Sequence, residues 1–183
     1  MKLDLTLLPV DEETKVGSSH ILGCPDVPSS WNEEAVFYND EVFLGQINLA
    51  DVNSLELPQT GILYFFFASK SKPYRGIVRY TNDLESLERV DFNYPELLDA
   101  HFEQEYQITF SEGDGKIELL GTMPKFNHFK VSNDMIVLLK FNPQDYPLID
   151  LFKGVDEEIC YLIKKDDLKH HLFEKAFLSL SLE

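Results

Sequence analysis

Three apolar motifs occur in the same order in both halves of this sequence, and this repetition constrains the fold more than any other feature. The first half contains Leu22-Gly23-Cys24-Pro25, Phe43-Leu44-Gly45-Gln46-Ile47-Asn48 and Ile62-Leu63-Tyr64-Phe65-Phe66. The second half contains Leu120-Gly121-Thr122-Met123-Pro124, Val137-Leu138-Leu139-Lys140-Phe141-Asn142 and Ile159-Cys160-Tyr161-Leu162-Ile163. Each copy of a duplicated unit has an apolar face that needs a partner. The repetition therefore predicts two related, strand-rich halves that share a core, with chance similarity between two ordinary strand pairs as the alternative.

The length and apolar content predict one domain. The 183 residues are 44% hydrophobic and 13% aromatic, and a chain of this length buries roughly 70% of its unfolded surface. We therefore expect a single domain over residues 1–183. Its pseudo-repeat halves lie at about 18–80 and 118–183, joined by 81–117.

Alternating and continuous apolar residues predict a strand-rich fold with few short helices. The predicted strands are 3–7 (an edge strand that Pro9 ends), 41–49, 62–68, 77–80, 106–110, 135–141, 158–163 and 178–182. Strand 62–68 is apolar on both faces, which is typical of a central strand. Gly45 indicates a bulge or a close backbone approach. Helices are expected at 96–105 and from Asp166, and Gly113-Asp114-Gly115 is typical of a hairpin turn.

The charge balance excludes one class of partner and favours another. The chain has 32 acidic and 16 basic residues, a formal charge of −16. Such a surface repels nucleic acid and anionic membranes, whereas it attracts a basic protein. Solubility alone is the alternative explanation of the charge.

Cysteine usage and hydropathy predict a cytoplasmic protein. Cys24 and Cys160 are too few and too far apart for a secreted disulfide scaffold. The N-terminal residues turn acidic at Asp4 and lack the apolar segment of a signal peptide. No run approaches the ~20 apolar residues of a membrane span.

We expect no metal site, no cofactor and no catalytic residue. His20 and Cys24 are four residues apart and His170-His171 are adjacent, but no zinc-binding spacing occurs. Cys24 acting as a nucleophile with His20 is the catalytic alternative. A structural role in the protein interior is the commoner state of a cysteine, so whether the protein is an enzyme stays open.

The candidate binding residues are polar side chains on the repeated strand. Gln46 and Asn48 alternate with apolar residues, and Lys140 and Asn142 repeat their positions in the second half. Inward-facing polar groups need hydrogen-bond partners, so these four either line a pseudo-symmetric cleft or brace the loops at Leu22-Gly23 and Leu120-Gly121. If they line a cleft, Trp31 and Tyr64 are its expected walls.

The same motifs resemble those of the YwqG-like family, a bacterial domain of unknown function. The resemblance runs from Leu22 through Trp31 and Phe43–Leu49 to Leu57-Pro58-Gln59-Thr60-Gly61 and the strand after it, with a C-terminal counterpart from Leu119 to Leu168. The family often has paired glycines at Leu22-Gly23, Trp-Pro at Trp31-Asn32 and Gln at Lys140. The resemblance implies an α+β fold of mainly antiparallel sheets with internal pseudo-symmetry, and no established reaction. Some relatives occur beside secreted bacterial toxins, which implies an immunity role.

Together these observations predict a non-enzymatic protein-interaction module. We expect a basic protein partner, with a toxin as the candidate and immunity as the role. The alternative is a small-ligand-binding protein or enzyme with its site between the two halves, near Gln46, Asn48 and Lys140.

Overall fold

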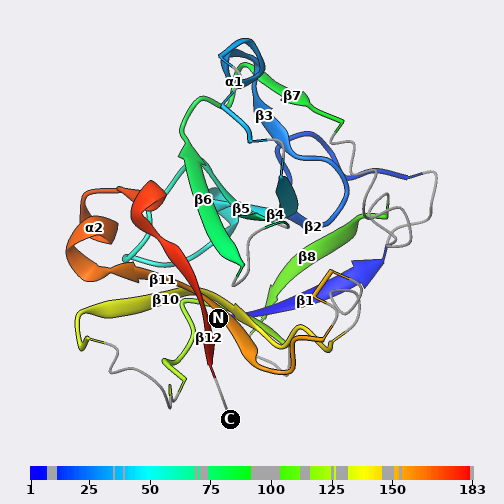
Figure 1. Cartoon of the computed structure of the whole chain (residues 1–183). Helices are drawn as coiled ribbons and strands as arrows, with labels where there is room; N and C mark the ends of the chain where they lie inside the picture. The colour runs from blue at the N-terminus through cyan, green and yellow to red at the C-terminus, as the bar shows by residue number, and fades with distance from the viewer. Residues whose placement is uncertain are drawn as a thin grey trace.

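The computed structural model shows a protein built mainly of antiparallel strands with a few short helices (Figure 1), which confirms the predicted sheet. The structure describes residues 1–7, 12–34, 36–38, 40–68, 70, 74–91, 104–111, 116–124, 126, 132–145, 151–152 and 154–181. No helix among these residues has the length and apolar composition that crossing a membrane requires.

Ten strands of the described residues form one sheet. They are β1 (Lys2–Leu7), β2 (His20–Ile21), β4 (Glu41–Asn48), β5 (Ile62–Ala68), β6 (Arg75–Thr81), β8 (Tyr106–Ser111), β9 (Ile117–Leu119), β10 (Met135–Phe141), β11 (Glu158–Lys164) and β12 (Phe177–Ser181). Their order is β12-β11-β10-β9-β1-β8-β2-β4-β5-β6. The two end strands, β6 and β12, contact each other, so the sheet curls around its own interior.

The remaining elements are short and lie around the sheet. Strands β3 (Asp26–Pro28) and β7 (Leu87–Arg89) pair with each other. The helices are α1 (Ser29–Glu33), η1 (Leu49–Asp51), α2 (Lys165–Lys169) and η4 (Phe173–Lys175). In Figure 1, α1, β3 and β7 lie at the top of the molecule beyond β4, β5 and β6, whereas α2 lies at the left.

The strand order has a symmetry that follows the chain. The chain contains two successive sets of five strands in this sheet: β1, β2, β4, β5, β6 and then β8, β9, β10, β11, β12. Counted from either end of the sheet, the fifth, fourth and third strands of one set come first, followed by its second strand. The first strands of the two sets, β1 and β8, pair with each other at the centre. Each of them also pairs with the second strand of the other set, β1 with β9 and β8 with β2. The two segments therefore exchange their first strands at the centre of one continuous sheet.

Both halves also share an unusual bulge. The pairing of β4 with β5 shifts at Leu44, and the pairing of β10 with β11 shifts at Leu138. The carbonyl oxygens of Leu44 and Leu138 accept hydrogen bonds from the backbone N–H groups of Leu22 and Leu120, each at 3.0 Å. Leu22 and Leu120 have positive φ angles of 60° and 50°, which branched L-residues rarely adopt.

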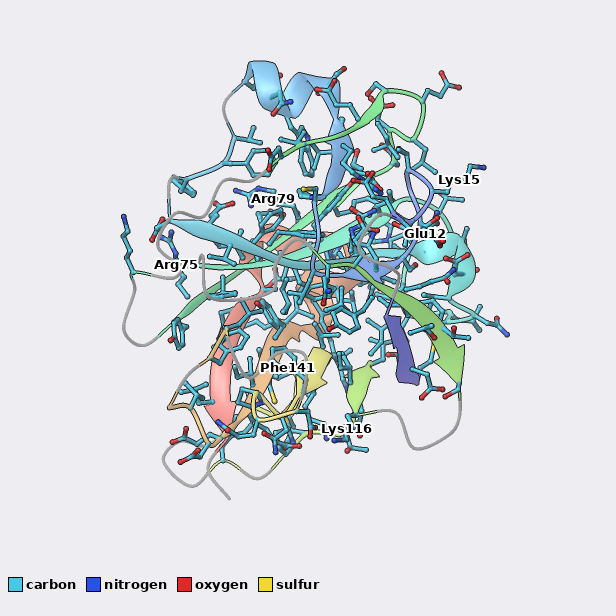
Figure 2. The ribbon with its side chains drawn as sticks, turned by 90° about the vertical axis from the view of Figure 1, so that its right-hand side faces the viewer. Glu12, Lys15, Arg75, Arg79, Lys116 and Phe141 are labelled. Carbon is cyan, nitrogen blue, oxygen red and sulfur yellow. The ribbon has the colours of Figure 1, made fainter. Side chains whose placement is uncertain are left out.

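The main core lies inside the curled sheet, where side chains of the two halves meet. The rings of Phe65 on β5 and Tyr161 on β11 lie 5.2 Å apart. The Tyr161 hydroxyl donates to the Phe66 carbonyl oxygen at 2.9 Å. Figure 2 shows Phe141 of β10 among the side chains of the lower half and Lys116 at its edge. The halves are thus joined by a shared apolar interior as well as by the exchanged strands.

Each half of the sheet has a smaller apolar cluster on its other face. On β4 and β5 this cluster contains Phe43, Ile62, Tyr64 and Phe66. On β10 and β11 it contains Val137, Cys160 and Leu162. The first cluster lies under Trp31 and Val27, which belong to the α1 and β3 layer.

The structure confirms several strand predictions and corrects others. Strand 62–68, the helix at Asp166, the final strand and the bulge at Gly45 are confirmed. The predicted strand 3–7 is present as β1, but its predicted position at an edge is wrong, because β1 lies in the middle of the sheet between β8 and β9. Trp31, for which no helix was predicted, lies on helix α1. Most of the predicted helix at 96–105 lies outside the described residues, and its last two residues, 104–105, are not helical. The predicted turn at 113–115 also lies outside the described residues.

The predicted alternation along strand 41–49 also fails at one point. Because Leu44 is the extra residue of the bulge, it packs in the main core with Val42 and Ile47. Phe43 points to the opposite face, where it contacts the ring of His20. The extra residue of a bulge switches which face of the strand the following side chains occupy. Gly45 indicated that a bulge would occur here, but the sequence did not show which side chains would change face.

Candidate functional site

Gln46 is fully buried and holds the loop that precedes β3. Its side-chain oxygen accepts from the Asp26 backbone N–H at 2.8 Å. Its amide nitrogen donates to the Ser18 carbonyl oxygen at 2.9 Å and to the Asp26 carboxylate at 2.8 Å. The hydrogen bonds of Gln46 therefore hold Ser18 and Asp26, which lie on either side of Leu22-Gly23 in the chain.

Asn48 has a comparable set of local bonds. Its amide nitrogen donates to the Gly17 carbonyl oxygen at 2.8 Å, and its side-chain oxygen accepts from the Ala50 N–H at 3.0 Å. Its backbone N–H donates to the Ser19 hydroxyl, which in turn donates to Asp51 at 3.0 Å. Asn48 therefore caps η1 and anchors the loop at Gly17.

Lys140 lies on β10 and Asn142 directly follows that strand, and β9, β1, β8 and β2 separate β10 from β4 in the sheet. Lys140 forms an ion pair with Glu118 at 3.3 Å and approaches Glu158 at 3.9 Å. The side-chain oxygen of Asn142 accepts from the Gln144 backbone N–H at 2.9 Å. The structure thus places Gln46 and Asn48 together, and Lys140 and Asn142 together, but gives each pair its own partners.

The sequence reasoning missed a buried ionic cluster centred on Arg89. Arg89 donates to Asp26 at 2.8 and 3.2 Å and pairs with Glu105 at 3.2 Å and Glu13 at 3.0 Å. Asp26 is completely buried and Glu105 nearly so. Burial disfavours the charge of Arg89, but the hydrogen bond and charge of Asp26 outweigh it and raise the pKa of Arg89. The cluster joins β3, β7 and the segment at Glu105, which are far apart in sequence.

His20 lies within the same polar region, and its two ring nitrogens have different neighbours. Nε2 lies 3.1 Å from the Cys24 carbonyl oxygen, and Nδ1 lies 3.2 Å from both the Thr14 hydroxyl and the Ser18 carbonyl oxygen. Burial lowers the pKa of His20, although the charges of Glu105 and Asp26 act in the opposite direction. Each ring nitrogen of His20 therefore faces a backbone carbonyl oxygen, while burial disfavours the charged form of the ring.

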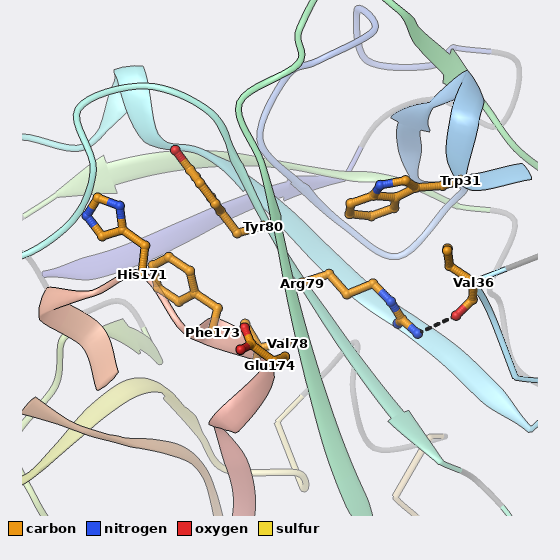
Figure 3. A pocket seen from close by; sticks show the side chains of 8 residues that line it. All are labelled: Trp31, Val36, Val78, Arg79, Tyr80, His171, Phe173 and Glu174. Carbon is orange, nitrogen blue, oxygen red and sulfur yellow. Dashed lines mark hydrogen bonds between the residues drawn. The ribbon is translucent and has the colours of Figure 1, made fainter. Parts of the chain in front are cut away.

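A half-open pocket of about 280 Å³ lies over β6, between α1 and the segment that follows α2 (Figure 3). We call it the aromatic pocket. It is lined by Trp31, Val36, Val78, Arg79, Tyr80, His171, Phe173 and Glu174. Trp31 and Tyr80 are half-buried, whereas His171 and Glu174 are exposed. The pocket joins elements of both halves of the sequence.

The aromatic rings of the pocket form two groups, one on each side of β6. Tyr80 lies 5.2 Å from Phe173 and 6.1 Å from His171 between ring centroids. On the α1 side, Trp31 packs on the fully buried Tyr64 at 5.3 Å. The Tyr64 hydroxyl donates to the Asp26 carbonyl oxygen at 2.5 Å. Of the two predicted walls, Trp31 lines the pocket and Tyr64 supports it from beneath.

Arg79 is the cation of the pocket lining, and its charge is already compensated. It forms two hydrogen bonds with the buried carboxylate of Glu41, at 2.6 and 2.7 Å. A third bond runs to the Val36 carbonyl oxygen at 2.9 Å, drawn in Figure 3. The guanidinium also lies 5.1 Å from the ring centroids of both Phe37 and Phe66. In Figure 2, Arg79 lies inward from the surface, unlike Arg75 at the side of the molecule.

The surroundings of the Cys160 thiol do not suit a nucleophile. Cys160 is buried, and burial raises the pKa of its thiol to about 12. Cys24 is partly exposed, and the ring of His20 is directed at its carbonyl oxygen. In the described part of the chain, no three His, Cys, Asp or Glu side chains are grouped so as to hold a metal ion.

Most of the pocket residues were missed from the sequence, because they come from distant positions. Trp31 was predicted only as a wall of a different cleft, at Gln46 and Asn48, whereas Arg79, Tyr80, Phe173 and Glu174 carry no local motif. One available signal was the adjacent pair His170-His171, of which His171 adopts a φ of 57° and turns into the pocket lining.

Comparison with known proteins identifies the family of the chain. The family described as Domain of unknown function (DUF1963) matches residues 19–135, which is more than half of the sequence, and the chain belongs to this family. No curated protein matches the chain. The matched residues include Trp31, Arg79 and Tyr80 of the aromatic pocket, whereas His171 and Glu174 follow them.

Proposed function

We propose that this member of the DUF1963 family acts by binding a protein partner, and that the aromatic pocket is the centre of the binding surface. The observation that carries the proposal is the pocket itself, which exposes aromatic rings of both halves next to each other. Aromatic side chains that remain partly exposed on a folded protein are enriched at protein interfaces.

The size of the pocket favours a side chain of a partner over a metabolite. Sites for small molecules usually measure about 300–1,000 Å³ and enclose most of the ligand. The aromatic pocket measures about 280 Å³ and is half open, so it suits one large side chain whose backbone remains outside. A small-ligand function, the alternative prediction, has its best place in this pocket and not at Gln46 or Lys140, which bind within the protein.

The proposal also concerns the nature of the partner. With a formal charge of −16, the protein attracts basic proteins and accelerates their encounter. The YwqG-like resemblance suggests a secreted bacterial toxin as that partner, neutralised by steric cover. An immunity role then requires that co-expression of this protein protects cells from the toxin.

The first experiment identifies the partner and maps its site. The tagged protein is used to capture partners from a host lysate at low and moderate salt, and the recovered protein is then purified and its affinity measured by calorimetry. His171→Gly removes one wall of the pocket while suiting the positive φ of that position. His170→Ala is the matched control, since the adjacent His170 does not line the pocket.

We expect His171→Gly to bind the purified partner at least about tenfold more weakly than the wild type, because contact at the centre of an interface is lost. His170→Ala should bind like the wild type. Equal affinity of all three proteins would refute the pocket as the binding site. A metabolite that raises Tm by several degrees in the wild type but not in His171→Gly would favour the small-ligand alternative instead.

We further propose that the two halves of the chain are related by duplication. The proposal is supported by the matched strand order, the bulges at Leu44 and Leu138 and the positive φ of Leu22 and Leu120. In a crystal structure, residues 41–66 should superpose on 135–163 with the bulged leucines aligned. A superposition that fails to align the two bulges would refute it.

A further inference from the structure

We propose that the occupant of the aromatic pocket is an arginine side chain of a basic partner polypeptide. The inference rests on the proposed function, since it names the chemistry that the pocket recognises. It is carried by three features of the pocket: partly exposed aromatic rings, an exposed carboxylate and a lining cation whose charge is compensated.

The aromatic rings suit a planar cation. A guanidinium within about 6 Å of a Trp or Tyr ring centroid is attracted by the electron-rich face, more strongly when water is excluded. Trp31 and Tyr80 are both half-buried and line the pocket from opposite sides of β6 (Figure 3). The Tyr80 hydroxyl donates to the Thr60 carbonyl oxygen at 3.1 Å, which holds the ring in place. Burial raises the pKa of Tyr80, so the ring remains a neutral phenol.

The carboxylate of Glu174 supplies the charge that an arginine needs. Glu174 lines the pocket and is exposed. The neighbouring Lys175 directs its ammonium to Asp167 at 2.8 Å. A guanidinium stacked on Tyr80 therefore has a carboxylate within the same pocket, and hydrogen bonds between charged groups are roughly twice as strong as neutral ones.

The lining cation does not oppose this arrangement. The two terminal nitrogens of Arg79, Nη1 and Nη2, each donate to one oxygen of the buried Glu41 carboxylate. The ion pair is therefore neutral as a unit. Arg79 also shows that arginine packs well in this part of the protein, because it lies 5.1 Å from two phenylalanine ring centroids. With a net charge of −16 for the whole chain, the long-range field also favours a cationic ligand.

The test compares a charged peptide with its uncharged isostere. Acetylated and amidated tri-arginine is titrated into the full-length protein beside tri-citrulline, which has nearly the same shape without the charge. Trp31 is the single tryptophan of the sequence, so its fluorescence and its indole N–H resonance report directly on the pocket. Glu174→Gln removes the pocket carboxylate, and Glu56→Gln is the matched control because it removes one exposed charge elsewhere.

We expect tri-arginine to perturb Trp31 and to bind about tenfold more tightly than tri-citrulline. Glu174→Gln should weaken tri-arginine several-fold, and Glu56→Gln should leave it unchanged. Equal binding of the two peptides, equal losses in the two variants, or no perturbation of Trp31 would each overturn the arginine assignment. These results test only the arginine assignment. The proposed function, that the pocket binds a protein partner, is tested separately and is refuted if the purified partner binds His171→Gly as tightly as the wild type.

Discussion

At the scale of single residues, polar side chains inside the first half act mainly as braces for loops. Gln46 and Asn48 hold the segment from Gly17 to Asp26, while Arg89 joins that segment to Glu105. Among the described residues, every buried side-chain nitrogen and oxygen has a hydrogen-bond partner. Removing one of these hydrogen-bonded side chains should lower the free energy of unfolding, because it leaves a buried backbone group or carboxylate without its partner.

Replacing Gln46 tests this bracing role. In Gln46→Ala, the Asp26 N–H and the Ser18 carbonyl oxygen lose their partner in the protein interior. We expect the free energy of unfolding to fall by about 2–4 kcal/mol, measured by urea denaturation. Gln59→Ala is the control, since the exposed Gln59 also donates to two loop carbonyl oxygens, and it should cost less than about 1 kcal/mol. A Gln46→Ala protein as stable as the wild type would contradict the bracing role.

His20 predicts a dependence of stability on pH. Burial lowers its pKa in the folded state below the ordinary value of 6.5. As the pH falls through 6.5, the unfolded chain therefore takes up a proton that the folded protein excludes, and stability is lost until the folded pKa is reached. The slope is at most about 1.4 kcal/mol per pH unit.

The measurement is urea denaturation at about pH 7.5 and about pH 5.5. His20→Gln does not titrate, and its amide nitrogen can donate to the Cys24 carbonyl oxygen that Nε2 faces. We expect the stability of this variant to change less between the two pH values than that of the wild type. A steeper dependence in the variant would show that other groups, such as Glu105 and Asp26 that face His20, control the response.

At the scale of elements, the bulge in β4 decides which side chains enter the core. The extra residue Leu44 reverses the alternation, so Phe43 faces the β3 layer and Leu44 faces the main core. The bulge is fixed by the bond between Leu22 and Leu44, and β10 has the equivalent bond between Leu120 and Leu138. A local irregularity therefore sets the packing of a whole strand.

Gly45→Ala tests the bulge. A Cβ atom at Gly45 would lie 2.8 Å from the His20 carbonyl oxygen and 2.6 Å from the Ile21 side chain. Because the first contact is with backbone, we expect the variant to lose about 2 kcal/mol or more in thermal or urea unfolding. Gly154→Ala is the comparison: it has a positive φ but no atom within 4 Å of the added methyl, so it should lose only about 1 kcal/mol. The reverse ranking would show that β4 can move away from β2.

At the scale of the whole molecule, two features join the halves into one body. The first strands are exchanged at the centre of the sheet, and Phe65 and Tyr161 meet in a common core. A change in one half should therefore alter the stability of the other. We therefore expect residues 1–183 to unfold as one domain.

Leu162→Ala provides the test, because Leu162 is fully buried in the apolar cluster of the second half. We expect a loss of about 2–5 kcal/mol. The unfolding midpoint should fall equally whether it is followed by far-UV circular dichroism or by Trp31 fluorescence, which reports on the first half. A fluorescence midpoint that stays at the wild-type value while the dichroism midpoint falls would show two independent domains.

The sequence by itself determined the local structure and the charge of this protein. Short apolar runs predicted β5, β10 and β11, and alternating apolar residues predicted β12, because these patterns suit a strand that is buried on two faces or on one, whatever lies next to it. Gly45 marked a bulge for a similarly local reason. The tertiary structure alone decided that β1 is central, that Gln46 binds Asp26, and that Trp31 and Glu174 line one pocket. These facts depend on contacts between residues far apart in the chain, and no periodicity encodes which distant side chain will compensate a buried charge or complete a cavity.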